Sequence, residues 1–215
     1  MGGNILTQME QEQIKEAIRL VEKNTSSEIV VMVVPDCGPY PAATIWGAAS
    51  LSFPLALLLT PATCAFFWFP PQNMWVFLTW FILLFTASFL GIQRSAVLRR
   101  LFIRDKEMEN QVRETAQKNF FMQGLYRTRD ETAVLIFISM LEQMVSILPD
   151  RGVNKKIPQA EWQSIVEVIT SGIRETQAAQ AIVDGVTEAG KRLMAHFPAA
   201  TQDKEELENL VVKQS

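Results

Sequence analysis

The sequence has no aspartate, glutamate, lysine, arginine or histidine between Asp36 and Arg94, although charged residues make up 20% of its 215 positions. The same block holds all but one of the five tryptophans. The apolar core of a soluble domain is interrupted by polar residues every few positions, and this block is not. We therefore predict that it lies in a membrane and that the charged flanks are soluble.

Other features that the sequence lacks exclude several classes of function. A net charge of -3 and a pI near 5.3 argue against a nucleic-acid partner, which would need a basic face. His196 is the only histidine, which excludes a histidine-based triad or a multi-histidine metal site. Cys37 and Cys64 do not have the spacing of a metal or redox motif. No glycine-rich phosphate loop or nucleophile elbow occurs, so the motifs predict no cofactor and no catalytic residues.

The uncharged block divides into two runs, 42–69 and 74–92, on either side of the short segment Pro70 to Asn73. Each run is long enough to cross about 30 Å of hydrocarbon at about 1.5 Å per residue. We expect a two-span hairpin over 42–92 with no ionisable group at depth, which favours an anchor over a transport path. Small residues such as Ala48, Ser52 and Ala56 could pack laterally, and a homo-oligomer is one consequence.

Basic residues follow the second span directly. They are Arg94, Arg99, Arg100, Arg104 and Lys106, whereas the segment between the spans is uncharged. Because arginines resist translocation, we expect both termini and the soluble domain to be cytoplasmic. Arg94, Arg99, Arg100 and Arg104 are candidates for binding lipid headgroups, but topology alone explains them equally well.

The flanks predict one soluble domain that the hairpin splits. Before the hairpin, a capping box at Thr7 and Glu10 opens a helix near 8–23, and a strand follows at 28–34. After it we expect a helix at 105–122, strands at 132–139 and 144–148, a helix opened by Pro158, and a helix at 176–196. The fold class is an α/β or α+β sandwich of helices on a small central sheet. Its parts are 1–41 and 93–200, followed by a loose tail at 201–215.

The segment that follows the last predicted strand has three readings. Asp150, Arg151, Gly152, Asn154 and Lys155 form the candidate binding loop. Asp150 with the acidic pair Asp130-Glu131 could form an acid/base or metal site if the two loops lie at the same end of the sheet. Arg151 with Lys155 and Lys156 could hold a phosphate. The loop could also be an edge that binds a protein. The third reading is a simple turn, in which Gly152 permits a positive φ and the lysines stay solvated.

Three separated groups of residues resemble the TPM-domain family. They are Thr25-Ser26-Ser27-Glu28-Ile29, Asp150-Arg151-Gly152 with Pro158 and Trp162, and His196-Phe197-Pro198. The chain is most similar to the bacterial subgroup in which a two-span hairpin is inserted in the domain. This resemblance implies an α/β/α sandwich at the inner membrane of a bacterium and a role in the assembly or maintenance of membrane protein complexes.

The resemblance also implies weaker alternatives. Phosphatase activity and binding of a divalent metal such as calcium or magnesium have been proposed for some members. Many members carry a Gly-x-Gly turn with acidic residues where this sequence has Leu148-Pro149-Asp150-Arg151-Gly152, so no metal ligand transfers by position. We expect an interaction module for another membrane protein, with a metal-assisted phosphatase or hydrolase that uses Asp150 and Arg151 as the alternative.

Overall fold

The computed structural model describes residues 6–68, 70, 73–128, 131–175, 177–199 and 210–212. The chain divides into two compact units. We call Met1–Cys37 together with Glu109–Ser215 the sheet unit, and Gly38–Met108 the hairpin unit. The hairpin unit includes a further short helix that packs against the two long ones.

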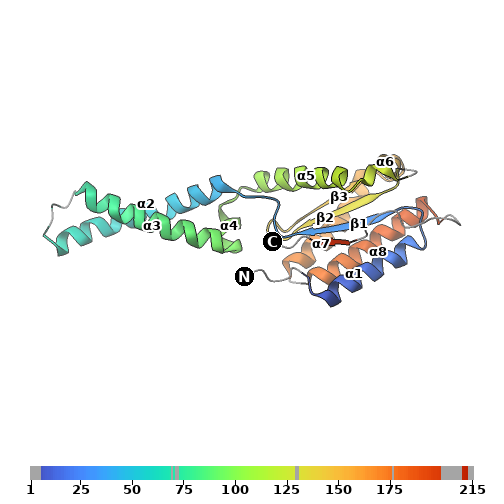
Figure 1. Ribbon diagram of the computed structural model, residues 1–215, viewed down its shortest axis with the longest axis horizontal. Helices are drawn as coiled ribbons and strands as arrows, with labels where there is room; N and C mark the ends of the chain where they lie inside the picture. Colours follow the sequence, from blue (N-terminus) through green and yellow to red (C-terminus); the bar gives the residue numbers. More distant parts are fainter. Residues whose placement is uncertain are drawn as a thin grey trace. The chain divides into compact units, whose positions relative to one another are not determined.

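The sheet unit is built around one four-stranded sheet (Figure 1). Its strands are β1 (Ile29–Val34), β2 (Val134–Ser139), β3 (Met144–Pro149) and β4 (Leu210–Val212), in the spatial order β3-β2-β1-β4. β1 pairs in parallel with both β2 and β4, and β3 pairs antiparallel with β2. All residues of β1 and β2 are buried, which explains why these strands are apolar throughout instead of alternating.

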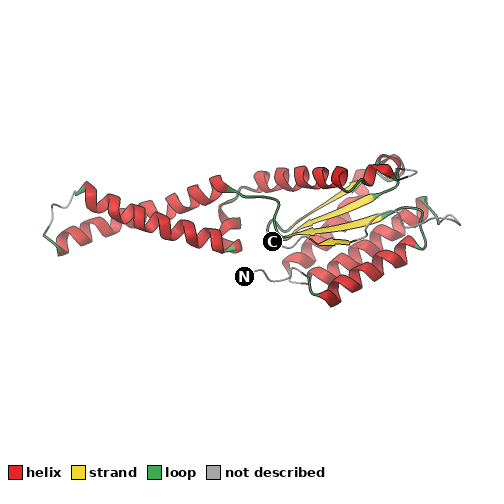
Figure 2. Cartoon of the chain, viewed as in Figure 1, coloured by secondary structure: helices red, strands yellow, loops and turns green. Residues whose placement is uncertain are grey.

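Helices cover both faces of the sheet (Figure 2). One buried cluster joins the sheet to α1 (Gln8–Glu22), α7 (Gln163–Arg174) and α8 (Ala178–His196). A second cluster joins the opposite face to α5 (Asp105–Met122) through Val112, Ala116 and Phe120. Two short 3₁₀ helices, Leu125–Arg127 and Gln159–Trp162, precede β2 and α7 respectively. The predicted sandwich of helices on a small sheet is confirmed.

Local chemistry fixes the ends and the packing of these helices. Thr7 and Glu10 form the predicted capping box at the start of α1, since each side chain bonds the backbone N–H of the other residue. Gly190 allows α8 to lie close to α1, because a Cβ at this position would lie 2.5 Å from Val21 Cγ1. The absence of a side chain at Gly190 therefore brings the two helices together.

Two local predictions were wrong. The segment after β3 is not a turn: it forms α6 (Arg151–Lys156), with Asp150 as its N-cap and Gly152 inside the helix. The predicted tail at 201–215 contains β4, which extends the sheet beside β1, and the rest of that tail lies outside the described residues. Each error has the same cause: these segments are only six and three residues long, too short to show a periodic pattern.

The hairpin unit contains α2 (Pro41–Phe66), α3 (Met74–Arg94) and α4 (Ala96–Phe102). Both α2 and α3 are long and apolar enough to cross a membrane. α2 buries small residues, namely Ala48, Ser52, Ala56, Thr60 and Cys64, at a spacing of four. α3 carries Phe77, Phe81, Phe85 and Phe89 at the same spacing, with neighbouring rings about 6 Å apart and Phe53 of α2 against the first two.

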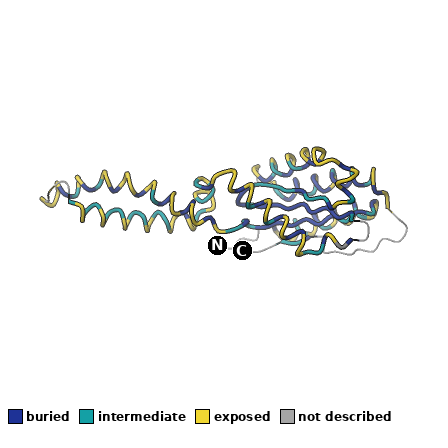
Figure 3. The backbone as a smooth tube through the Cα atoms, turned by 90° about the horizontal axis from the view of Figure 1, so that it is seen from above, coloured by how far each residue is buried: buried dark blue, intermediate teal, exposed yellow. Residues whose placement is uncertain are grey.

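This pairing changes the expected role of the small residues. Ala48 and Ala56 are fully buried between the helices of one hairpin, so they are not available for lateral contact with a copy. Figure 3 shows the resulting pattern: buried positions recur between exposed ones along α2, and half-buried positions alternate with exposed ones along α3. Trp80 also has a partner within the hairpin, because its Nε1–H donates to Thr63 Oγ1 over 3.0 Å. Small side chains thus allow the close approach of two helices in cis.

Candidate functional site

Two loops meet where β2 begins and β3 ends. The N–H of Asp150 donates to the carbonyl of Ala133 over 2.8 Å, and the N–H of Gly152 donates to the carbonyl of Glu131 over 2.9 Å. The condition set by the sequence is therefore met, since the Asp150 and Glu131 loops lie at the same end of the sheet. Asp130, the other residue of the acidic pair, lies outside the described residues.

Asp150 is the buried acidic residue of this site. Its Oδ1 accepts a hydrogen bond from the N–H of Arg151 over 2.7 Å, which caps α6. Its Oδ2 is buried and has no hydrogen-bond partner in the described part of the chain. A buried carboxylate oxygen without a partner loses the hydrogen bonds it would make in water, so this atom can accept a proton donor or a cation.

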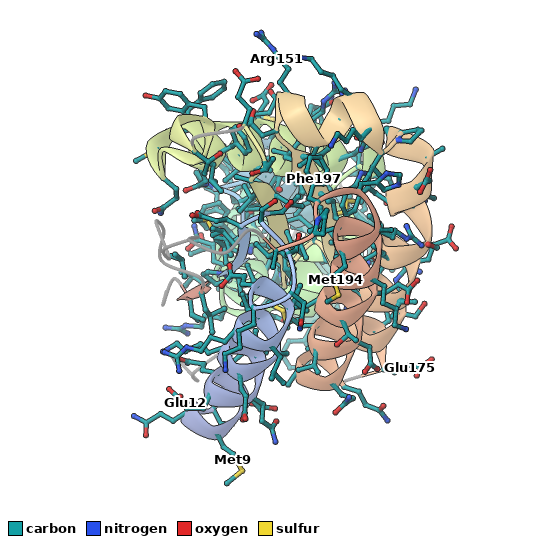
Figure 4. All side chains as sticks on the ribbon, turned by 90° about the vertical axis from the view of Figure 1, so that its right-hand side faces the viewer. Met9, Glu12, Arg151, Glu175, Met194 and Phe197 are labelled. Carbon is teal, nitrogen blue, oxygen red and sulfur yellow. The ribbon has the colours of Figure 1, made fainter. Side chains whose placement is uncertain are left out.

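The other predicted binding residues face solvent. Arg151, Asn154 and Lys155 are exposed and occur at the spacing of one face of α6. Figure 4 shows Arg151 projecting away from the body of the domain. Asp150 points inward while these residues point outward, so α6 separates the predicted loop into a buried acid and an exposed polar face.

Lys156 is exposed, as expected of a solvated lysine, and it also makes two contacts. Its Nζ lies 4.2 Å from the centre of the Phe197 ring and donates to the carbonyl of His196 over 3.2 Å. These contacts attach α6 to the end of α8. His196 contributes its backbone to this contact, and its side chain is exposed.

The groups of residues that carried the family resemblance gather at this end of the sheet unit. Thr25 Oγ1 donates to the carbonyl of Phe197 over 2.6 Å, and Thr25 also forms an isolated bridge with Pro198. The hydroxyl of Ser27 is buried and, within the described residues, has no hydrogen-bond partner. The three separated groups are therefore one structural region, and most of their contacts hold the segments together.

The described residues do not fit a calcium or magnesium site. Calcium takes six to eight oxygen ligands, and magnesium is held by carboxylates together with water or phosphate. Within the ranges that the structure describes, no three histidine, cysteine, aspartate or glutamate side chains gather in a group that could hold a metal. We derive no reaction step through a metal at Asp150.

The sequence did not reveal a polar cluster at the opposite end of β1 and β2. Glu142 is fully buried, and its carboxylate accepts hydrogen bonds from the Ser139 hydroxyl and, over 3.1 Å, from the N–H of Cys37. The carbonyl of Cys37 in turn accepts from Gln111 Nε2 and Thr115 Oγ1, each over 3.3 Å. Burial, followed by the nearby Glu142 charge, raises the pKa of the Cys37 thiol to about 12. This cluster fixes the chain where it leaves β1, and the thiol stays neutral and unreactive.

The sequence also did not reveal an exposed apolar patch at the end of α5. Phe121, Met122 and Tyr126 are 64%, 69% and 44% exposed, and the rings of Phe121 and Tyr126 lie 5.9 Å apart. We call these three residues the aromatic patch. Its sequence signal is the run Phe120-Phe121-Met122 at the end of a charged helix, in which Phe120 turns inward and its neighbours do not.

Residues 93–192 match the family model described as the TPM domain. The solved structure of the BA42 protein from the psychrophilic bacterium Bizionia argentinensis aligns with a TM-score of 0.59 at 20% identity, over 97% of this chain and 96% of that one. No match to a curated protein is found. The resemblance drawn from the separated residues is confirmed, and the similarity to BA42 supports the fold.

Proposed function

We propose that this chain, a member of the TPM-domain family, is a membrane-anchored interaction module that helps to assemble or maintain a membrane protein complex. Two features support the proposal. The hairpin unit provides two helices of spanning length, and the sheet unit exposes apolar side chains where a soluble domain would have polar ones. We place the protein in the inner membrane with both termini cytoplasmic, because the arginines follow the second span.

The aromatic patch is the observation that carries the proposal. Aromatic residues and methionine are enriched in the centres of protein interfaces, and exposed apolar side chains in contact with one another mark such sites. Beside α5 on the same face of the sheet, Met144 and Leu148 of β3 are only partly buried. A partner that covers the aromatic patch and these β3 residues would remove apolar surface from water.

The edge of β3 adds a smaller polar contribution. Because Asp150 donates to Ala133, the antiparallel pattern turns the backbone of Val145, Ile147 and Pro149 away from β2. Pro149 has no N–H to lose on that side, as expected at a sheet edge. Ile147 is buried, whereas Val145 is partly exposed, so the edge offers a partner only a short accessible stretch.

Site-specific photo-crosslinking in living cells tests this proposal. A photoreactive phenylalanine analogue at Phe121 or Tyr126 should give one discrete crosslinked membrane protein, while the same analogue at Leu20, an exposed apolar residue of α1, should give none. A crosslinked product of twice the mass of the chain would identify a second copy as the partner. Equal crosslinking at all three positions, or none at any, would contradict the proposal.

A second function has one specific observation in its favour, the unpartnered Asp150 Oδ2 with Arg151 next to it. A hydrolase that acts on phosphate esters would use Asp150 as the acid or base and Arg151 to hold the phosphate. Asp150→Asn keeps the cap of α6 and removes the charge. Turnover of a phosphomonoester that this variant abolishes at unchanged melting temperature would support the hydrolase; turnover that survives in the variant would remove it.

A further inference from the structure

The hairpin unit does not end with its second long helix. Ser95 ends α3 in an extended conformation and at once caps α4, its hydroxyl accepting from the N–H of Leu98 over 3.4 Å. The chain therefore turns a corner at a single residue, and Figure 1 shows α4 set across the ends of α2 and α3 instead of continuing the line of α3. α4 packs against both of these helices.

α4 has a polar and an apolar side. Successive residues of an α-helix are about 100° apart, which places Val97, Leu98, Leu101 and Phe102 on one half of α4 and Arg99 and Arg100 on the other. Part of the apolar half packs against α2 and α3. Val97 and Leu101, one turn apart, are 80% and 74% exposed. A seven-residue helix that exposes an apolar stripe opposite two arginines has the pattern of a helix lying in a membrane interface.

One contact holds α4 in this position. Phe102 packs onto the backbone of α2 at Gly47, where a Cβ would lie only 2.7 Å from Phe102 Cγ. On the α2 side of this contact, Trp46 is exposed, which is typical of an aromatic residue at a membrane surface. The apolar surface of the two long helices is therefore continuous with the apolar side of α4.

The charge at this corner has one sign. No aspartate or glutamate occurs between Asp36 and Asp105, while Arg94 ends α3 and Arg99 and Arg100 lie on α4. Arg94 is exposed, and Arg99 and Arg100 are half-buried. Arg104 lies outside α4 and directly precedes α5. A surface with adjacent apolar and basic parts matches the acyl and phosphate levels of an anionic bilayer.

We propose that α4 is an interfacial helix that binds anionic phospholipid headgroups through Arg94, Arg99 and Arg100, with Val97 and Leu101 in the upper acyl region. This inference rests on the membrane anchoring proposed above. It adds two properties to the proposed anchor. The anchor prefers anionic lipids, and the turn between α3 and α4, where the chain leaves the bilayer, lies at a fixed depth. Arg104 does not belong to the site.

Lipid selectivity is the first test. The full chain is reconstituted into nanodiscs that contain phosphatidylcholine and phosphatidylglycerol, and the lipids that stay bound after mild release are weighed by native mass spectrometry. Phosphatidylglycerol should be enriched, and Arg99→Gln with Arg100→Gln should lower the enrichment by about five-fold for each arginine removed. The matched control is Arg113→Gln with Lys118→Gln, two exposed basic residues of α5. Equal enrichment in the α4 variant and the control variant would overturn the proposal.

Depth in the membrane is the second test, and it separates this proposal from the anchoring itself. Nitroxide labels are placed singly at Val97, Arg99 and Leu101 in vesicles of the same two lipids, after replacement of Cys37 and Cys64. Collisions with oxygen should dominate at Val97 and Leu101, and collisions with a water-soluble nickel chelate at Arg99. If all three labels contact water equally while the protein resists alkaline extraction, α4 is not interfacial and the anchor stands. If alkaline extraction releases the protein, the anchor fails as well.

Discussion

The sheet unit and the hairpin unit bury opposite kinds of side chain. In the sheet unit large apolar residues such as Trp162 and Phe137 form the core, the aromatic patch is an exception, and β1 and β2 expose none of their residues. In the hairpin unit the buried residues of α2 are small, and large residues such as Leu58 and Trp75 are exposed. In water, burial follows the apolar area that is removed from solvent. Between helices in lipid, the environment that we propose for the hairpin unit, that area brings no gain, so close contact between backbones decides which residues are buried.

The largest expected difference in stability between the two units comes from replacing a tryptophan in each. Trp162 is buried in the core of the sheet unit, whereas Trp75 is exposed on α3. Trp162→Ala should lower the free energy of unfolding by about 3–5 kcal/mol, because a large cavity replaces the indole. Trp75→Ala should leave it unchanged. Urea titration of both variants in detergent micelles, followed by circular dichroism, measures this, and equal losses would contradict the comparison.

The next largest change in stability is expected on replacing the buried Glu142, which lies in the sheet unit. Glu142→Ala leaves the Ser139 hydroxyl and the Cys37 N–H without their acceptor, at a cost of about 3 kcal/mol in the free energy of unfolding. Glu142→Gln should cost less, since one amide oxygen still accepts. The control is Glu161→Ala at an exposed glutamate, measured by the same titration. A Glu142→Ala variant as stable as this control would show that the cluster does not stabilise the domain.

Two glycine substitutions test the packing of the hairpin unit. Gly47→Ala places a methyl group against Phe102 and should cost about 1–3 kcal/mol, seen as a lower melting temperature in detergent. Gly91→Ala meets no atom within 4 Å and should be neutral. The same two variants should differ in phosphatidylglycerol enrichment if α4 is displaced. Equal melting temperatures would mean that the contact with Phe102 is not tight.

Each unit has one cysteine, and pH should distinguish them. The folded state raises the pKa of Cys37 to about 12 from an ordinary value of 9.0, so the unfolded state loses this proton first. The resulting stability is complete below pH 9.0 and is lost as the pH rises toward about 12, by less than about 1.4 kcal/mol per pH unit.

Alkylation gives the measurement. In vesicles, urea should expose Cys37 to a small maleimide while Cys64, buried within the hairpin, stays protected. A Cys37→Ser variant should show a weaker loss of stability at alkaline pH. Rapid alkylation of Cys37 in the folded protein at neutral pH would contradict the raised pKa.

The smallest effect concerns the cap of α6. Asp150→Ala should destabilise the sheet unit by about 1 kcal/mol, and Asp150→Asn by a few tenths at most, because asparagine caps equally well. Thermal unfolding of the two variants beside the wild type shows the difference. A larger cost for Asp150→Asn than for Asp150→Ala would mean that the charge, and not the cap, holds this end of the sheet.

The sequence predicted the long elements because their patterns span several turns or a whole strand. The helix at 105–122 was predicted with the observed ends, and the spans, the strands and the helix after the capping box differ from the structure by a few residues. α4, α6 and β4 were missed because helices and strands this short depend on tertiary contacts, such as Phe102 on Gly47.

The candidate site was predicted only in part. The sequence identified Asp150 as the notable acid, but it could not show that the carboxylate turns inward while Arg151 and Lys155 turn outward. It also gave no sign that Glu142, in a four-residue turn, would be buried. Burial of that charge depends on Ser139 and on the backbone of Cys37, which lies 105 positions away in the chain. Contacts between residues so far apart leave no local pattern.

The insertion of the hairpin between β1 and β2 has a consequence for the order of events during synthesis. The central pair of strands cannot form until Val134 has been synthesised to pair with Ile29. The outer strand cannot pair until Leu210 has been synthesised to pair with Val31. Chain closure over such separations is slow, whereas contacts within the hairpin unit join positions that lie closer in the sequence, such as Gly47 and Phe102. The nascent chain therefore completes its hairpin unit while the first helix and strand of the sheet unit still lack their partners.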